Sequence, residues 1–80
     1  MARFEVRLYA TLQQYGPHPP HSDAIAVQLA DGATVGDLIL ELQLPVQEVN
    51  KVFVNYRAVE DGYILQEGDR VGIFPLVAGG

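Results

Sequence analysis

The chain has 80 residues, contains no cysteine and carries a formal net charge of −5 at pH 7. A chain of this length suits one small domain, so we expect a single domain over residues 1–80. The lack of cysteine excludes disulfides and thiolate-bound metals. The negative charge argues against a nucleic-acid partner and favours a basic groove on a protein partner. The sequence shows neither a signal peptide nor an apolar run of about 20 residues, the length of a membrane span. We therefore expect a cytoplasmic protein without membrane contact.

Two stretches of alternating apolar and polar residues near the N-terminus predict β-strands. Residues 3–10 and 24–29 each direct alternate side chains to one face, which is typical of a strand with one side in water. The apolar residues of these two faces are Phe4, Val6, Leu8, Ile25, Val27 and Leu29. We expect residues 11–15 to turn away from the first strand. Residues 16–23 contain three prolines and predict a loop.

A helix is predicted after the turn at Asp31-Gly32. Thr34 is a suitable N-cap residue, and Asp37 stands at the capping-box position, where glutamate or glutamine is more usual. The apolar residues that share one face of this helix are Val35, Leu38, Ile39 and Leu42. We expect the helix to end at Leu44, because the residue before a proline avoids the α-helical conformation.

The second half of the chain predicts short strands separated by turns. Residues 45–50 suit a single helical turn with Pro45 at its first position. The predicted strands span residues 51–55, 58–59 and 70–74. The acidic turns at residues 60–62 and 67–69 are interpreted as turns with solvated charge, and Pro75 should end the last strand because it has no N–H to donate. This order of elements predicts an α+β fold in which one helix covers one face of a sheet.

The last six residues, from Pro75 to Gly80, are predicted to form a flexible tail. No charged side chain follows Arg70, and the tail narrows to two glycines. Six extended residues reach up to about 20 Å. Gly79 and Gly80 have no Cβ to shield the last carbonyl carbon. Such a tail can present its terminal carboxylate as a reactive group, and the alternative interpretation is an ordinary frayed chain end.

The other candidate sites are weaker. His18 and His21 lie in the proline-rich loop without an evident third ligand, so we expect no metal site. Ser22 is adjacent to His21 and Asp23, but the members of a catalytic triad meet in space and are rarely sequence neighbours. We expect no catalytic residue, and we interpret the protein as a carrier or substrate of enzymes rather than as an enzyme.

Three groups of residues match the pattern of a known family. They are Thr34-Val35 with Leu38 and Leu42, Val54-Asn55 with Val59, and a closing block of Leu65, Gly68-Asp69, Val71, Phe74-Pro75, Val77 and Gly79-Gly80. These landmarks resemble the ubiquitin-like sulfur carriers of the MoaD/ThiS family, which includes the molybdopterin-synthase small subunit and the carrier of thiamine biosynthesis. The Phe74-Pro75 step is closer to the molybdopterin branch. The chain departs from the family in its proline- and histidine-rich loop and at Tyr56, where a glycine is common.

The resemblance implies a β-grasp fold with the first and last strands side by side. It also implies that an E1-like adenylating enzyme uses ATP to adenylate the carboxylate of Gly80, and that a sulfur donor converts this group into a thiocarboxylate. The residues implied to enter a partner's channel are Pro75, Leu76, Val77, Ala78 and Gly79, with Phe74 at the docking surface. The implied partner is a synthase large subunit or another sulfur-accepting enzyme, above all in molybdopterin or tungsten-pterin synthesis. No tightly bound cofactor is implied.

Three other functions use the same fold. The first is a ubiquitin-like modifier that is conjugated to lysines through Gly80, and the second is a sulfur carrier for thiamine thiazole. The third is a non-reactive β-grasp binding module, such as an RNA-binding regulatory domain. The acidic charge and the Gly-Gly end count against the third.

Overall fold

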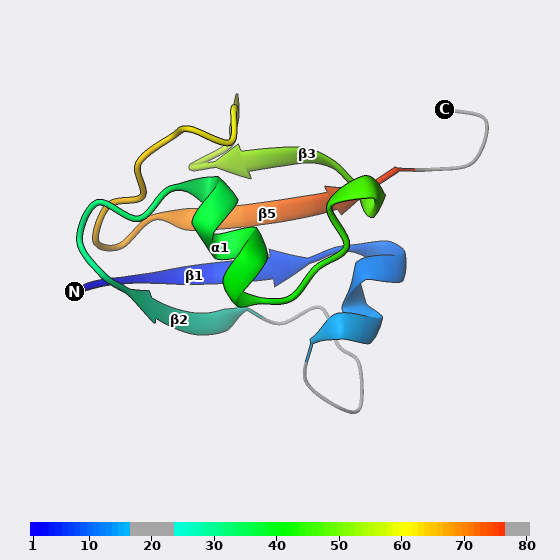
Figure 1. Ribbon diagram of the computed structural model, residues 1–80, viewed down its shortest axis with the longest axis horizontal. Helices are drawn as coiled ribbons and strands as arrows, with labels where there is room; N and C mark the ends of the chain where they lie inside the picture. The colour runs from blue at the N-terminus through cyan, green and yellow to red at the C-terminus, as the bar shows by residue number, and fades with distance from the viewer. Residues whose placement is uncertain (17–23, 77–80) are drawn as a thin grey trace.

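The computed structural model describes residues 1–16 and 24–76. Within them, one mixed sheet of five strands has the order β2-β1-β5-β3-β4. The helix α1 (Val35–Glu41) crosses one face of this sheet (Figure 1). The strands are β1 (Ala2–Leu8), β2 (Ile25–Leu29), β3 (Val49–Val54), β4 (Arg57–Val59) and β5 (Arg70–Pro75). β1 and β5 are parallel, whereas the other neighbouring pairs are antiparallel. The expected α+β, β-grasp architecture is confirmed.

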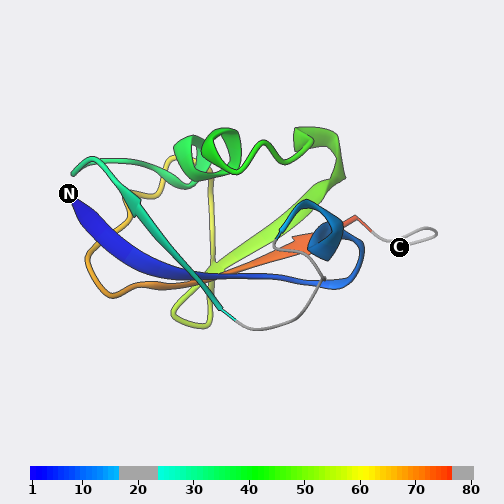
Figure 2. The same cartoon turned by 90° about the horizontal axis from the view of Figure 1, so that it is seen from below.

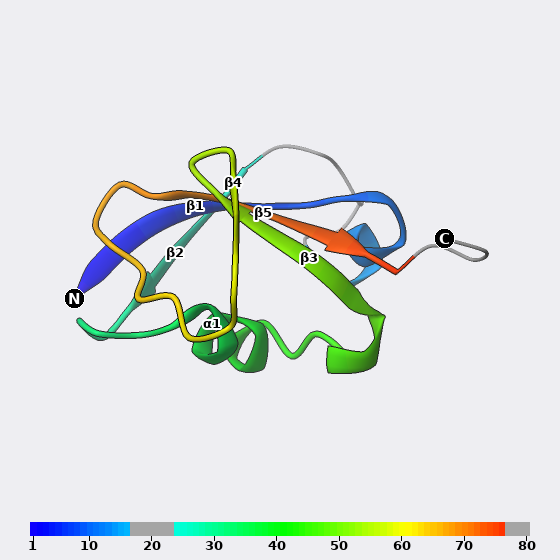
Figure 3. The same cartoon turned by 90° about the horizontal axis from the view of Figure 1, so that it is seen from above.

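The sheet has a covered face and an open face. In the edge-on views, α1 lies on one side of the sheet, and the turn between β3 and β4 projects on the other (Figures 2 and 3). Burial alternates residue by residue along β1, and the same alternation in β5 turns Val71 and Ile73 toward α1. The core between helix and sheet includes Phe4, Val6, Leu8, Val35, Leu38, Ile39, Val71 and Ile73. The inward positions predicted for the first strand and the helix are thus confirmed.

The predicted N-terminus of α1 is also confirmed. The Oγ1 atom of Thr34 accepts a hydrogen bond from the backbone N–H of Asp37 at 3.2 Å, and the Asp37 carboxylate accepts one from the backbone N–H of Thr34 at 2.9 Å. These two bonds satisfy donors that the first turn of a helix leaves free.

The C-terminus of α1 differs from the prediction, because the helix ends before Leu44 and does not need Pro45. Gln43 has a left-handed φ of 57°. Its N–H donates to the carbonyl of Leu40, and the N–H of Leu44 donates to the carbonyl of Ile39. These two bonds form a Schellman motif, in which the left-handed residue is usually glycine. The turn directs Leu44 back into the core, where 5% of it is exposed.

Two short 3-10 helices complete the fold, η1 (Ala10–Tyr15) and η2 (Val46–Glu48). The turn predicted over residues 11–15 is therefore helical, and buried Leu12 anchors it. Pro45 precedes η2 as its N-cap residue instead of forming its first position. β3 begins two residues earlier than predicted, because Val49 pairs with Pro75. Among the residues described, no helix is long and apolar enough to cross a membrane.

Asp69 is the one charged residue that is buried in the described part of the chain, with 6% of its surface exposed. Its carboxylate accepts hydrogen bonds from the Asn55 side-chain amide at 2.9 Å and from the backbone N–H of Gln66 at 2.8 Å. The Asn55 side chain in turn accepts a hydrogen bond from the backbone N–H of Arg70 at 3.0 Å. The prediction of a solvated charge is wrong at Asp69, because these donors take the place of water around the carboxylate.

The helix–sheet core generates the first testable prediction. Leu38 is fully buried, whereas Leu40 on the same helix is 69% exposed. Leu38→Ala should lower the free energy of unfolding by about 2–5 kcal/mol, because it removes buried carbon atoms and leaves a cavity. Leu40→Ala is the control and should change the free energy by less than about 0.5 kcal/mol. Urea unfolding followed by circular dichroism measures both, and equal effects would contradict this core.

The buried carboxylate generates the second prediction. Asp69→Ala should lower the free energy of unfolding by about 1.5–3 kcal/mol, because the amide groups of Asn55 and Gln66 lose a charged acceptor. Asp61, an exposed turn residue, provides a control with the same substitution. Asp61→Ala should stay within about 0.5 kcal/mol of the parent protein. A small effect at both positions, measured by urea unfolding, would show that the hydrogen bonds to Asp69 add no stability.

Candidate functional site

The chain leaves the sheet after β5, at Leu76, and we call this residue the tail root. Pro75 is buried and pairs with Val49, and β5 ends at this proline as predicted, although Pro75 itself still belongs to the strand. Proline is tolerated here because the next residue supplies the hydrogen bond, and the N–H of Leu76 donates to the carbonyl of Glu48 at 2.9 Å. Leu76 itself is 58% exposed. The remaining predicted tail residues, 77–80, lie outside the described part of the chain.

The two 3-10 helices support this root. The Tyr15 hydroxyl at the end of η1 donates a hydrogen bond to the carboxylate of Glu48 in η2 at 2.9 Å. That bond raises the pKa of Tyr15 above its ordinary value, and partial burial and the negative charge of Glu48 add to the shift. Since the Glu48 carbonyl holds Leu76, one residue links η1, η2 and the end of the last strand. Contacts that involve both η1 and η2 therefore set the direction in which the chain leaves the sheet.

Phe74, the predicted docking residue, lies on the open face among other aromatic rings. Its ring stacks on Tyr9 with the centroids 4.3 Å apart and the planes within 4°. Phe53 meets it edge-on, with centroids 5.3 Å apart and an angle of 82°. The three rings come from the end of β1, from β5 and from β3, and the pairing of these strands brings them together. Phe74 lies two residues before the tail root at Leu76.

Gly72 gives the aromatic rings room on β5. A Cβ at this position would lie 3.2 Å from a ring carbon of Tyr9 and 3.4 Å from one of Phe74. The first distance is shorter than an ordinary carbon–carbon contact, and the second is at the short limit of one. The absent side chain therefore lets the stacked pair lie close to the backbone, and it forms the floor of a hollow on the open face.

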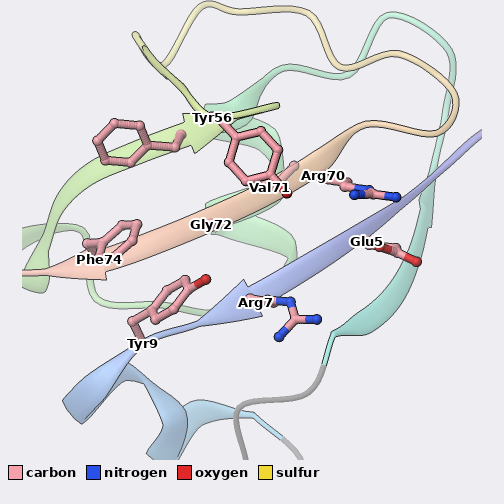
Figure 4. A pocket seen from close by; sticks show the side chains of 9 residues that line it. Glu5, Arg7, Tyr9, Tyr56, Arg70, Val71, Gly72 and Phe74 are labelled. Atoms are coloured by element: carbon pink, nitrogen blue, oxygen red, sulfur yellow. The ribbon is translucent and has the colours of Figure 1, made fainter.

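This hollow is a pocket of about 660 Å³ that crosses β1, β5 and β3. Figure 4 shows aromatic rings toward the end of β5 and charged side chains toward its beginning. Tyr56, from the turn between β3 and β4, stands over β5 beside the charged side chains (Figure 4). The lining residues that bear charge are Glu5, Arg7 and Arg70. The pocket thus joins an apolar half, which borders Phe74, to a polar half with an excess of positive charge.

The described strand residues that point to the open face carry a net charge opposite to that of the whole chain. By strand alternation, four of the five basic residues point to this face: Arg3, Arg7, Lys51 and Arg70. Glu5 is the one acidic residue within the strands that the structure describes. The net charge of −5 therefore resides elsewhere on the molecule. The basic partner groove expected from total charge does not complement this face.

The other sequence candidates add no site. His18, His21 and Ser22 lie outside the described residues. Within residues 1–16 and 24–76, no group of three His, Asp or Glu side chains is arranged to hold a metal ion. Sequence reasoning found Phe74 but missed Tyr9, Phe53 and Gly72, because their proximity depends on strand register. The alternation that exposes Gly72 beside Phe74 was the only available signal.

The third prediction concerns the floor of the pocket. Gly72→Ala should displace Tyr9 from Phe74, which removes the mutual ring-current shifts of their ring protons in NMR spectra. Alanine normally stabilises a strand relative to glycine, but loss of stacking should offset about 0.5–1.5 kcal/mol of that gain. Gly62→Ala is the matched control, since a Cβ there meets nothing within 4 Å. Unchanged ring shifts in Gly72→Ala would contradict the described packing.

Comparisons with known proteins agree with the fold. The model of the Mut7-C ubiquitin family matches residues 1–79, and no curated protein sequence matches the chain. The structure of the putative molybdopterin converting factor, subunit 1, from Pyrococcus furiosus is 30% identical, with a TM-score of 0.75. The match covers 96% of this chain and 100% of that one.

Two further structures share the fold. Small archaeal modifier protein 1 of H. volcanii is 25% identical with a TM-score of 0.74, and the match covers 96% of this chain and 100% of that one. The other structure is a complex of subunits 1 and 2 of molybdopterin-converting factor from Helicobacter pylori 26695. The matched chain in it is 18% identical, with a TM-score of 0.61 and coverage of 98% of this chain and 99% of that one. The match along nearly the whole sequence, together with the β-grasp topology, shows that this chain belongs to the Mut7-C ubiquitin family of ubiquitin-like proteins.

Proposed function

We propose that this protein is a sulfur carrier whose reactive group is the C-terminal carboxylate of Gly80. The observation that supports this most is the 30% identity, over 96% of the chain, to the Pyrococcus furiosus protein described as a molybdopterin converting factor subunit. The sequence from Phe74 to Gly80 fits the role, because it leads from the sheet into two unhindered glycines. The most specific form of the proposal places the carrier in molybdopterin or tungsten-pterin synthesis.

The proposed chemistry takes place on partner enzymes. The Gly80 carboxylate attacks the α-phosphorus of ATP on an E1-like adenylating enzyme, and pyrophosphate leaves. A sulfur donor that supplies a hydrosulfide equivalent then attacks the acyl carbon, and AMP leaves with the acyl–oxygen bonding electrons. A carboxylate is a poor acyl donor until it carries such a leaving group. The resulting thiocarboxylate carries sulfur to an acceptor enzyme, so this chain is a substrate and carrier.

The tail root sets the geometry of this delivery. The N–H of Leu76 is hydrogen-bonded to the carbonyl of Glu48, and the proposed reactive residue Gly80 lies four residues further along the chain. Fully extended, four residues span at most about 14 Å, which is shorter than the reach of a tail that begins at Pro75. The partner must therefore bring its reaction centre close to the edge of the sheet. A surface that includes Phe74 is well placed to make that contact, because this ring lies on the open face beside the root.

A second function is supported by the similarity to small archaeal modifier protein 1, at 25% identity. In this alternative the activated Gly80 carboxyl group is transferred to a lysine amine of another protein. Both functions use the same adenylated intermediate, so they differ in the final nucleophile. Sulfur delivery leaves a thiocarboxylate, whereas modification leaves an amide bond between two chains.

The fourth prediction tests the carrier function. Intact mass is measured after incubation of the full chain with its cognate adenylating enzyme, ATP and a sulfide donor. We expect the increase for one sulfur in place of one oxygen, located at Gly80 by fragmentation. Deletion of Gly80 should abolish the increase, and Gly79→Ala should reduce it because a Cβ crowds the channel and restricts the backbone. Gly62→Ala, in an open turn, is the control and should react as the parent protein does.

Three results would reject the carrier function. One is an unmodified chain in the presence of an adenylating enzyme that is active on this protein. Another is equal sulfur uptake without Gly80. The third is protein from native cells that does not end at Gly80 by intact mass. Isopeptide adducts in the same cells, without thiocarboxylate, would favour the modifier function.

A further inference from the structure

The turn between β3 and β4 holds a conformational cost that the isolated protein does not recover. Asn55 and Tyr56 connect the two strands with φ angles of 52° and 71°. This left-handed pair suits a two-residue hairpin, in which asparagine followed by glycine is the favoured sequence. For a tyrosine the left-handed conformation is sterically unfavourable. Such an outlier, where it persists, is a reason to look for a function at the residue.

The two turn residues differ in the contacts that offset the cost of their left-handed conformation. Asn55 makes side-chain hydrogen bonds to Asp69 and Arg70, so its conformation is supported by the structure. Tyr56 is 85% exposed, and its side chain has no hydrogen-bond partner among the described residues. An exposed ring gains little from burial. The described residues therefore offer Tyr56 little compensation, which makes it a candidate for contact with another molecule.

The position of Tyr56 indicates where such a contact would occur. The ring stands over β5 at the border between the aromatic and charged halves of the open-face pocket (Figure 4). Opposite it lies the stacked pair of Tyr9 and Phe74, with Gly72 between them as the floor. An apolar side chain that entered the pocket would lie beside these rings. A neighbouring anionic group would then face Arg70, whose charge Glu5 offsets in part, and Arg7, which is itself already partnered.

We propose that the open-face pocket binds a segment of a partner protein that carries a large apolar side chain flanked by carboxylates, and that Tyr56 determines this specificity. The charge distribution favours an acidic partner, because four of the five basic residues lie on this face. The pocket borders Phe74, two residues before the tail root, so the segment belongs to the partner that receives the tail. In that respect the proposal rests on the proposed function.

The experiment uses NMR titration of the full chain with two synthetic peptides, Gly-Glu-Trp-Asp-Gly and Gly-Lys-Trp-Lys-Gly, both with blocked ends. The acidic peptide should cause saturable shifts of the amides of Arg7, Tyr56, Gly72 and Phe74. The basic peptide should not, because like charges on the open face repel it. Arg7→Gln and Arg70→Gln should each lower the affinity for the acidic peptide by about twofold to fivefold. Arg57→Gln, on β4 outside the pocket, is the control.

The Tyr56→Gly variant distinguishes a role in peptide binding from a role in stability. It should lower the affinity for the acidic peptide about threefold to tenfold. At the same time it should raise the Tm by about 2–6 °C, because glycine relieves the left-handed strain. Gln43→Gly is the matched control, since Gln43 is also exposed and left-handed, with a φ of 57°. It should raise the Tm by a similar amount and leave peptide binding unchanged.

Each other outcome would overturn the proposal. No saturable shift with the acidic peptide, or equal binding of both peptides, would remove the predicted specificity. Unchanged affinity in Tyr56→Gly would show that Tyr56 has no part in recognition, and a lower Tm would show a structural role instead. ADP in a parallel titration tests a nucleotide site, and stronger shifts with ADP than with either peptide would reject a protein segment. None of these readouts involves sulfur transfer, so the carrier function can fail while this proposal holds, and the reverse.

Discussion

The parallel pairing of β1 with β5 is the constraint on which the rest of the structure depends. It places the first and last strands together at the centre of the sheet, in a register that runs from Glu5 opposite Arg70 to Leu8 opposite Ile73. Parallel strands cannot be joined by a tight hairpin, so the intervening chain must cross over. Here α1 lies across one face of the sheet and leaves the other open. The central position of β5 also fixes where the chain leaves the sheet, next to η1 and η2.

The alternation within β5 assigns stability and recognition to different residues of one strand. Val71 and Ile73 face α1 and are almost completely buried. Gly72 and Phe74 face the opposite way, where they meet the rings of Tyr9 and Phe53. Substitutions on the open face can therefore alter a docking surface without loss of core volume. In a domain of this size, which has little stability to spare, that separation matters.

At two of the left-handed residues, hydrogen bonds and burial offset the local strain. The Schellman hydrogen bonds around Gln43 satisfy the carbonyls at the end of α1 and return Leu44 to the core. Asn55 is held by the buried carboxylate of Asp69, which also fixes the start of β5. In both cases hydrogen bonds and burial offset the cost of the conformation. Tyr56 has no such compensation within the described residues, which distinguishes it from the other two.

Local patterns in the sequence determined the elements of this protein, because they depend on spacings of two to four residues. The alternation around Phe4 and Val6 and the capping box at Thr34 predicted a strand and a helix start that the structure confirms. Properties that depend on strand register were decided only by the tertiary structure. They are the burial of Asp69 and Pro75, the cluster of aromatic rings from three strands, and the basic open face on an acidic chain. Register is set by long-range burial of the apolar face, and that information is distributed over the whole chain and not contained in any one segment.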